Sequence, residues 1–362
     1  MQLAPQHVAI IGAGPIACAS ACYLKNHGHH VALWSPTGRR LHIDLPTQQA
    51  CFQTHGAVSA QVCVDWLPTQ QALSDYPVVL ICLPGHLYQD LFSTLLPQLK
   101  NGQTVLISGA LSLASIWLSD QARQLGLELQ VGAWSTTATT AHFLADGQVH
   151  INELRSTIGV SSACAQDSQS ILSLSQTLLG DRFIADDNPL ASTLANINPI
   201  AHAAEVIPNL SRITRQEDWS LFACFGIEVG RIAQKLDEER LAIGKHFGFE
   251  LRSLVEHYHR SYHVPKGPLH EMAAAIEAAG KGPLGPKGLN HRYVLEDMPF
   301  GLAFQERLAI LAGIPCPIHS SALTLLEVVY DQDLRSSNFL LDQLLEDTQA
   351  LNYLVNRLSA AA

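Results

Sequence analysis

The stretch His7-Val-Ala-Ile-Ile-Gly-Ala-Gly-Pro-Ile-Ala17 decides the fold of the N-terminal part of this chain. Its first five residues, His7 to Ile11, have the apolar character of a buried strand, and a Gly-x-Gly-x-x-Ala turn follows at once. The Ala-rich segment that continues to Asn26 predicts a helix. Strand, glycine turn and helix in this order form the dinucleotide-binding fingerprint, so we expect a dinucleotide to bind at this turn.

Each small residue of the turn has a physical role in such a site. Gly12 permits the tight turn, Gly14 lets the backbone approach a pyrophosphate, and Ala17 keeps the helix close to the strand. Pro15 suits the first helical turn, where its missing N–H is not needed. Ile16 belongs to the same helix start, whose free backbone N–H groups attract an anion. A tight turn without a nucleotide is the alternative, and the flanking strand and helix argue against it.

The second predicted strand, His30 to Trp34, is followed by the residues that determine the preference for NAD or NADP. NAD-binding sites usually carry an Asp or Glu here, which binds the ribose hydroxyls. This chain has no carboxylate in Ser35-Pro-Thr-Gly-Arg39-Arg40. The Ser35 hydroxyl and the guanidinium groups of Arg39 and Arg40 suit a 2′-phosphate instead. We therefore expect NADP(H) to be preferred over NAD(H), with a solvated loop as the alternative interpretation of the two arginines.

Further apolar segments alternate with helical ones along the first half of the chain. Val78 to Cys82, Thr104 to Ile107 and Leu129 to Val131 are predicted strands, and helical segments separate them. This alternation predicts an α/β Rossmann-like fold with a doubly wound parallel sheet. Leu83 and Pro84 follow the first of these strands, where the cofactor crevice is expected.

After Asp186-Asp187 the pattern changes from apolar strands to long helices. Just before this boundary, Val149 to Ile151 and Thr157 to Val160 are predicted to form a hairpin at the edge of the sheet. Beyond it, helical spacing covers Pro189 to Ala204 and Trp219 to Phe247, among other segments. We expect a dinucleotide-binding domain over residues 1–187 and an all-α substrate and catalytic domain over 188–362. The substrate is expected in a cleft between them.

Composition narrows the class of protein further. The chain has 362 residues, of which 47% are hydrophobic and 15% charged, so it can bury a large core. The net charge of −10 argues against nucleic acid or an anionic membrane as the main partner. Neither a signal peptide nor an apolar run of about eighteen residues is present. The eight cysteines lack a Cys-x-x-Cys pair, so they are expected to be reduced core residues of a cytoplasmic protein.

Two polar clusters stand out in the helical part. The first is Asn196-Ile-Asn198-Pro199-Ile-Ala-His202, inside an otherwise apolar helix. The second is Arg292-Tyr293-Val-Leu-Glu296-Asp297-Met-Pro299, which follows a glycine-rich loop. Taken singly, each has an ordinary structural interpretation. His202 could be a core histidine, and Arg292 with Asp297 could be a structural ion pair.

Taken in order, the fingerprint, Asn-Pro-x-x-His and Arg-Tyr-x-x-Glu-Asp-x-Pro resemble the octopine/nopaline (opine) dehydrogenases over most of the chain. These enzymes reductively condense the amine of an amino acid with a 2-oxo acid. The resemblance implies that His202 is the general acid/base and that Asp297 fixes its tautomer and stabilises its cation. Arg292 would bind the oxo-acid carboxylate, and Asn198 would orient the substrate or the helix. Histidine suits this role because it titrates near neutrality. Small-molecule substrates and a homodimer are implied as well.

The chain departs from the family pattern at two places. Ala203 stands where a proline often follows the histidine, and Ala133-Trp134 stands where a Glu-Thr pair is frequent. The second change falls near the expected contact with the nicotinamide and the substrate, so the identity of the substrates does not follow from the resemblance. One alternative is a related two-domain dehydrogenase that reduces a 2-oxo acid or ketone to a hydroxy acid, usually with a catalytic lysine. The other is a non-catalytic NADP-binding sensor.

A histidine cluster in the helical part invites a metal, but the sequence does not supply a complete ligand set. His259 and His263 have helical i, i+4 spacing, and His257 lies beside them. No acidic or cysteine third ligand is placed nearby in the sequence. We therefore expect an exposed polar helix face and no metal.

Overall fold

The computed structural model describes residues 4–38, 41–44 and 46–359. It divides into two compact units, one ending at Ser192 and one spanning Thr193–Arg357, and the C-terminal end from Leu358 groups with the first. Within the described residues, no helix has the length and hydropathy needed to span a membrane.

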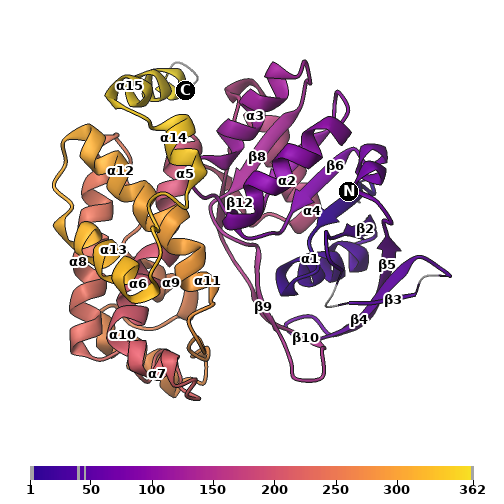
Figure 1. Ribbon diagram of the computed structural model, residues 1–362. Helices are drawn as coiled ribbons and strands as arrows, with labels where there is room; N and C mark the ends of the chain where they lie inside the picture. Colours follow the sequence, from indigo (N-terminus) through magenta and orange to yellow (C-terminus); the bar gives the residue numbers. More distant parts are fainter. Residues whose placement is uncertain (1–3, 39–40, 45, 360–362) are drawn as a thin grey trace. The chain divides into compact units, whose positions relative to one another are not determined.

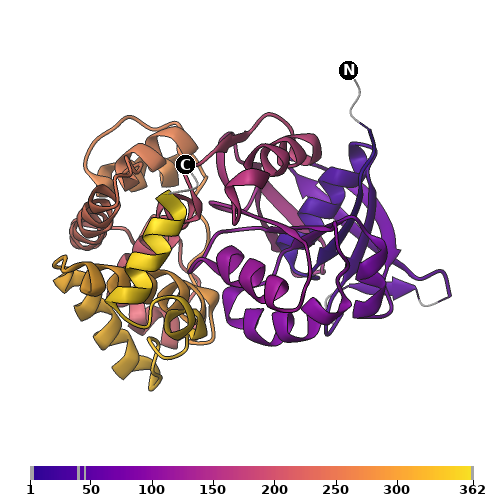
Figure 2. The ribbon, with the colours of Figure 1, turned by 90° about the horizontal axis from the view of Figure 1, so that it is seen from above.

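The first unit is built on one twelve-stranded sheet with helices on both faces (Figures 1 and 2). The strand order is β12-β11-β8-β7-β6-β1-β2-β5-β4-β10-β9, with β3 paired to β4. The strands are β1 (His7–Ile11), β2 (His30–Trp34), β3 (His42–Asp44), β4 (Gln49–Gly56), β5 (Ala60–Trp66), β6 (Val78–Ile81), β7 (Thr104–Ile107), β8 (Gln130–Trp134), β9 (Thr139–Phe143), β10 (Val149–Leu154), β11 (Ile158–Ser162) and β12 (Phe183–Ala185). The helices are α1 (Pro15–Asn26), α2 (Tyr88–Leu95), α3 (Ala114–Gln124) and α4 (Ser168–Leu179).

The centre of this sheet is the predicted doubly wound parallel core. Strands β8, β7, β6, β1, β2 and β5 pair in parallel, and every residue of β6 and β7 is buried. Alternate residues of these strands, such as Val8 and Ile10, join α1 and α4 in one apolar cluster. The stacked rings of Phe92 and Trp117 join α2 to α3. Continuous apolar strands are expected where a parallel sheet is covered on both faces.

The predicted edge hairpin is wrong. Strand β10 pairs with β9 and β4, whereas β11 pairs with β8 and β12 toward the opposite end of the sheet. Both strands extend the sheet, and the pairs β8–β11, β4–β5 and β9–β10 are antiparallel. A short apolar segment indicates a strand but not its partner, because register and neighbour depend on the rest of the sheet.

The second unit is helical. Its elements are α5 (Pro189–Ala195, which crosses the boundary), α6 (Asn198–Val206), α7 (Leu210–Thr214), α8 (Ile227–His246), α9 (Leu254–Tyr262), α10 (Leu269–Ala278), α11 (Arg292–Leu295), the π-helical turn η6 (Met298–Leu302), α12 (Ala303–Ala312), α13 (Pro317–Tyr330), α14 (Phe339–Leu344) and α15 (Thr348–Ser359). Two predicted helices are shorter than expected. The first breaks at Asn196-Ile197 into α5 and α6, and the second begins only at Ile227.

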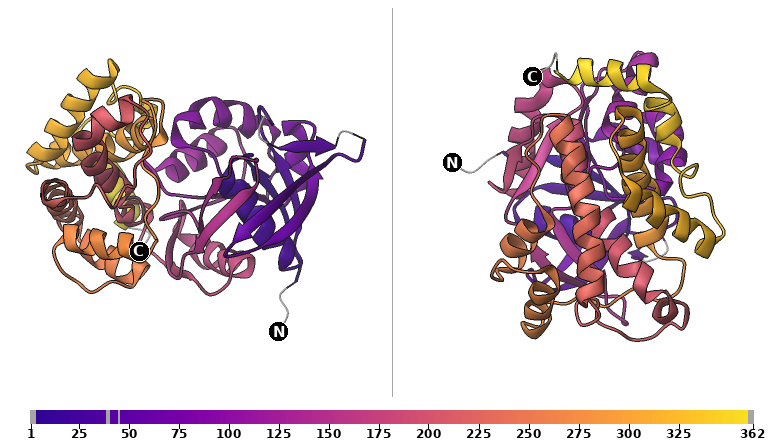
Figure 3. Two further views of the ribbon diagram at one scale, coloured as in Figure 1. Left: turned by 90° about the horizontal axis from the view of Figure 1, so that it is seen from below. Right: turned by 90° about the vertical axis from the view of Figure 1, so that its left-hand side faces the viewer.

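Helix α8, drawn in salmon in the right-hand view of Figure 3, carries the buried charges that tie this unit together. The fully buried Arg240 donates to Asp237 and to the carbonyl oxygens of Leu194 and Arg252. Asp237 in turn accepts the backbone N–H of Leu254 at the start of α9. A buried charge is tolerated when it is paired and hydrogen-bonded in this way. The network therefore holds the ends of α5 and α9 against α8.

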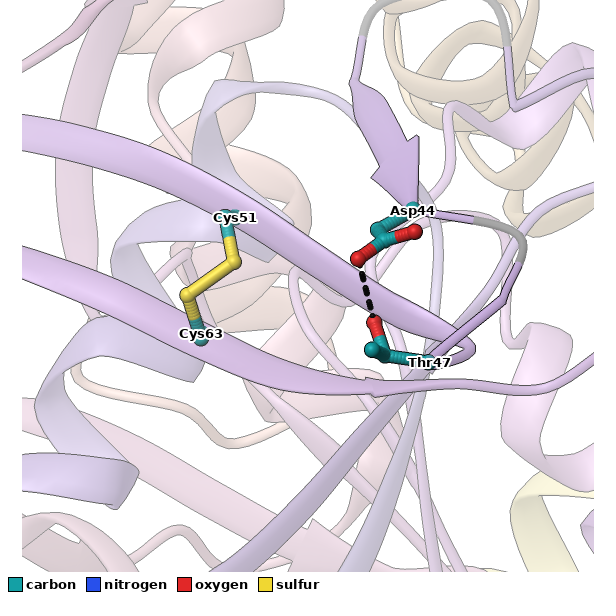
Figure 4. The surroundings of a disulfide bond; sticks show 4 residues. All are labelled: Asp44, Thr47, Cys51 and Cys63. Atoms are coloured by element: carbon teal, nitrogen blue, oxygen red, sulfur yellow. Dashed lines mark hydrogen bonds between the residues drawn. A yellow bond between two sulfur atoms is a disulfide. The ribbon is translucent and has the colours of Figure 1, made fainter.

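The cysteine prediction is wrong for two of the eight residues. Cys51 and Cys63 face each other across the antiparallel pair β4–β5 and form a disulfide (Figure 4). Their Cα atoms are 4.2 Å apart, the spacing of a non-hydrogen-bonded cross-strand pair. The other six cysteines are free. Since disulfides are typical of oxidising compartments, the cysteines do not support a cytoplasmic location.

We predict six titratable thiols per chain in denaturant without reductant, from the six free cysteines. The disulfide closes a short loop, with a sequence separation of 12 residues. Cys51→Ser with Cys63→Ser should therefore lower the free energy of unfolding by about 3 kcal/mol, because the denatured chain loses a constraint. Under reducing conditions the difference should vanish, and Cys224→Ser should have no comparable effect. A count of eight thiols would contradict the disulfide.

Candidate functional site

His202 and Asp297 form the centre of the candidate site in the helical unit. The Nδ1 of His202 lies 2.8 Å from the Oδ2 of Asp297, and both side chains are buried. His202 is on α6, and Asp297 directly precedes the π-helical turn η6. The two elements approach closely because Gly301 lacks a side chain, since a Cβ at this position would overlap Pro199 of α6. The second residue of α6 and a glycine of η6 thus bring the pair together.

The surroundings of His202 define its protonation. Burial lowers the pKa of its imidazole, and the nearby Asp297 opposes this shift by stabilising the cation. The neutral ring then carries its proton on Nδ1, where Asp297 accepts it. Tyr293 stacks on the same ring, with 3.5 Å between centroids and 11° between planes. The ring is therefore fixed in orientation, and among the described residues its Nε2 has no hydrogen-bond partner.

Asn198 lies on α6 with His202, and Arg292 begins α11, which shortly precedes Asp297. The Arg292 side chain is 47% exposed, and its Nη1 lies 3.7 Å from Oε2 of Glu296, one helical turn away. This guanidinium is accessible to an anion, and the Glu296 carboxylate pairs with its Nη1. Asn198 is half-buried at the start of α6, one turn before His202. The structure thus collects His202, Asp297, Arg292 and Asn198 within one unit.

The glycine-rich loop before Arg292 is pinned to the residues that precede α8. Gly285 donates its N–H to the carbonyl oxygen of Trp219, and the Trp219 indole donates to Pro286. A Cβ on Gly285 would overlap the Trp219 ring, which explains the glycine. The loop is thereby held in position where it leads into α11.

Sequence reasoning missed one member of this cluster, Glu205. Glu205 is on α6, three residues after His202, and is 3% exposed. Tyr258, on α9, is buried and belongs to an aromatic group with Phe222 and Tyr262. A glutamate among the apolar residues of α6 was the available signal for Glu205, because acidic side chains are seldom fully buried without a purpose.

The glycine turn of the first unit has the geometry of a nucleotide site. Gly12 has a φ of +138°, and a Cβ there would lie 2.8 Å from the carbonyl oxygen of Cys82. Gly14 is the N-cap of α1 with a φ of −83°, and a Cβ there would meet nothing within 4 Å. Pro15 and Ile16 form the first turn of α1, which no side chain caps. Open space and free backbone N–H groups at a helix start suit a pyrophosphate.

The sheet order places the remaining loops at the same crevice. Strand β1 lies between β2 and β6, and the direction in which successive strands are added to the sheet reverses there. The boundary between β1 and β6 is therefore a topological switch point. Leu83 and Pro84 follow β6 and are half-buried, and Ala17 packs under the turn. Ser35 follows β2, and its hydroxyl accepts the N–H of Gly38 at 3.4 Å. Arg39 and Arg40 lie outside the described residues.

The side chains of Ala133 and Trp134 lie in the interior of the first unit. Both residues end β8, and Trp134 is fully buried. The Trp134 indole donates to Ser175 of α4 at 3.0 Å and packs on Phe183. The large side chain at this departure from the family pattern therefore fills the core.

The histidine cluster carries structural contacts. His259 Nδ1 contacts the carbonyl oxygen of Val264 at 2.8 Å, and His263 ends α9 with a φ of +59°. In the parts of the chain that the structure describes, no group of three His, Cys, Asp or Glu side chains is arranged to hold a metal ion.

The chain is similar to known dehydrogenases in both units. Residues 185–330 match the family of the NAD/NADP octopine/nopaline dehydrogenase alpha-helical domain, and residues 8–109 match ketopantoate reductase PanE/ApbA. An opine dehydrogenase from Arthrobacter sp. (strain 1C) is 26% identical over 346 residues, which cover 93% of this chain and 94% of that protein.

Solved structures agree in fold. Octopine dehydrogenase in complex with NADH and agmatine has a TM-score of 0.73 at 14% identity, covering 98% of this chain and 97% of that one. Yersinopine dehydrogenase with NADP⁺ bound has a TM-score of 0.67 at 16% identity, covering 99% and 98%.

The matches define a two-domain, NAD(P)-dependent dehydrogenase with a Rossmann-like sheet and a helical domain. Within that class, the helical part matches the octopine/nopaline (opine) dehydrogenase family, and nearly the whole chain is similar to an opine dehydrogenase, so the resemblance predicted from its motifs is confirmed. These similarities identify the protein as an oxidoreductase.

The two glycines of the turn should respond differently to substitution. Gly14→Ala should fold normally, because its φ and the space around it tolerate a Cβ, but should weaken NADPH and NADH binding about tenfold or more by blocking the pyrophosphate. Gly12→Ala should lower the melting temperature, because it strains the backbone and crowds Cys82. Thermal unfolding and cofactor titration check both effects. A Gly14→Ala variant with unchanged cofactor affinity would place the pyrophosphate elsewhere.

Proposed function

We propose that this protein catalyses the reductive condensation of an amino acid, or another amine, with a 2-oxo acid. The observation that carries the proposal is the buried His202–Asp297 pair, which leaves one imidazole nitrogen without a partner among the residues that the structure describes. A bound nicotinamide cofactor supplies the hydride that reduces the imine carbon of the joined substrates. In the overall reaction the carbonyl oxygen leaves as water, and a secondary-amine dicarboxylate is formed from an amino acid.

His202 moves protons in this scheme through its Nε2. As a base it accepts a proton from the attacking amine, and as an acid it protonates the hydroxyl that leaves the carbinolamine as water. Asp297 holds the Nδ1 proton and stabilises the cation that forms during the step. Burial and stacking on Tyr293 keep the ring from turning away. The pair therefore supplies both proton transfers from one oriented side chain.

Arg292 and Asn198 would position the substrates. The accessible guanidinium of Arg292 matches the geometry of the oxo-acid carboxylate, which it can bind with two parallel hydrogen bonds. Asn198, one turn before His202, would orient the substrate or the start of α6. Both α6 and η6 would belong to one catalytic domain over residues 188–362. The helical-domain match that begins at residue 185 supports this proposal.

The cofactor site would lie at Gly12, Gly14, Pro15, Ile16 and Ala17, with Leu83 and Pro84 beside it. We propose a preference for NADP(H), because no carboxylate follows β2 and Ser35 with the two arginines after it suits a 2′-phosphate. Relatives have been solved with either cofactor, NADH in octopine dehydrogenase and NADP⁺ in yersinopine dehydrogenase.

The second candidate function is reduction of a 2-oxo acid or ketone to a hydroxy acid. It is favoured by the ketopantoate reductase match, but that match is confined to residues 8–109 and so covers the nucleotide-binding part alone. The helical part, which holds His202, Asp297 and Arg292, matches the opine dehydrogenases. The site residues therefore favour an amine as the second substrate.

The test is oxidation of NADPH and NADH, followed by absorbance, against amino acids crossed with 2-oxo acids. We expect oxidation only when both substrates are present, faster with NADPH, and a selective loss of NADPH affinity in an Arg39→Ala, Arg40→Ala double variant. Oxidation with an oxo acid alone would establish the hydroxy-acid reaction instead. Faster reaction with NADH would contradict the cofactor preference.

Asp297→Asn should change the pH dependence as well as the rate. In the oxidative direction His202 must be neutral to accept a proton, so the rate falls as the pH drops through its pKa. Burial lowers that pKa and Asp297 counteracts it, so removing the carboxylate should move the acid limb of kcat/KM to lower pH. The rate should also fall about 10²- to 10⁴-fold. An acid limb that stays in place would show that His202 is not the titrating group.

A further inference from the structure

One buried acid in the helical unit has no evident structural purpose. Glu205 is 3% exposed, and its buried Oε2 has no hydrogen-bond partner among the described residues. A buried polar atom that is left unsatisfied is costly, and such groups in native proteins call for an explanation. Glu205 lies three residues after His202 on α6, so the two side chains share one side of the helix.

The surroundings of Glu205 are acidic and aromatic. Burial, followed by the neighbouring Asp297, raises the pKa of Glu205 well above its usual range. Glu205 in turn contributes to the raised pKa values of the Tyr258 and Tyr293 hydroxyls. Among the described residues, no cationic side chain pairs with Glu205. A positively charged group would therefore be electrostatically favourable beside Glu205 and Asp297.

Three other acids of this unit, two of them buried and one half-buried, are paired with donors of the protein. Asp237 is paired with Arg240, Glu306 with Arg335, and Glu239 with His319 and two backbone N–H groups. Each of these acids ties helices together through donors that belong to the protein. The free Oε2 of Glu205 contrasts with them, because its donor is absent from the described chain.

We propose that Glu205 forms a cation subsite beside His202, in which its Oε2 binds the positively charged nitrogen of the amino substrate. This inference rests on the proposed function and adds the residue that recognises the amine. The ammonium supplies the missing donor, and its charge is favourable beside Glu205 and Asp297. Arg292 would hold the oxo acid, so each substrate is recognised by a charge of the opposite sign.

Binding to the full chain, measured by calorimetry with NADP⁺ present, tests the subsite directly. The probes are L-norleucine, which has an α-ammonium, 4-guanidinobutyrate, which has only a guanidinium cation, and hexanoate, which has no cation. Glu205→Gln keeps the shape of the side chain and removes its ability to ionise when a cation binds, and Glu205→Met removes its polarity. Both should weaken cation binding about 10- to 100-fold, as expected for a lost charged hydrogen bond, and leave hexanoate unchanged.

Two control variants separate recognition from folding. Glu306→Gln removes a buried acid that Arg335 already holds, and it should leave the affinity for every probe unchanged. In turnover, Glu205→Gln should raise the KM for the amine and leave the KM for the 2-oxo acid unchanged. Arg292→Lys should do the reverse. This crossed pattern would not arise from a general loss of stability, which thermal unfolding monitors for each variant.

The outcomes are distinct. Weaker binding of L-norleucine assigns the subsite to the α-amino group, and weaker binding of 4-guanidinobutyrate alone assigns it to a cationic side chain. Equal affinities of the wild type and both Glu205 variants for all probes would overturn the subsite, as would a wild type that binds neither cation. If cation binding depends on Glu205 but no substrate pair supports NADPH oxidation, the proposed reaction fails and the subsite stands.

Discussion

The candidate site depends on the hydrogen bond between His202 and Asp297, which joins residues 95 positions apart in the sequence. That bond requires α6 and η6 to pack with almost no space between them, and the missing side chain of Gly301 beside Pro199 provides the room. Tyr293 and Arg292 are carried by the same short segment as Asp297. One close helix contact therefore sets the position of the base, its partner and the proposed carboxylate ligand.

The two buried acids near His202 are in opposite electrostatic situations. Asp297 shares a proton with the imidazole, so its charge is balanced whenever the ring becomes cationic. Glu205 has no such partner, and burial beside Asp297 favours its neutral form. The two acids have different roles in the proposed site. Asp297 controls the proton of the imidazole, and Glu205 would bind the positive charge of the substrate.

Much of this architecture could be predicted from local patterns. The glycine turn, the apolar parallel strands and the change to helices after Asp187 all reflect short-range rules of the chain. The pairing of Cys51 with Cys63 could not, because it depends on the register of β4 against β5. Placing β10 and β11 failed for the same reason, since strands adjacent in sequence joined distant parts of the sheet. Glu205 was overlooked because burial of an acid becomes visible only when the helices around it are in place.

The two units also differ in how closely their structure is linked to the reaction. The first unit resembles many dehydrogenases because a switch point between β1 and β6 and a glycine turn suffice to bind a dinucleotide. Its departure from the family at Ala133-Trp134 fills the core, with the Trp134 indole hydrogen-bonded to Ser175. The helical unit carries the residues that the proposed amine chemistry requires, on α6, α11 and next to η6. The proposed reaction therefore depends on the helical unit, and the sheet would supply the cofactor site.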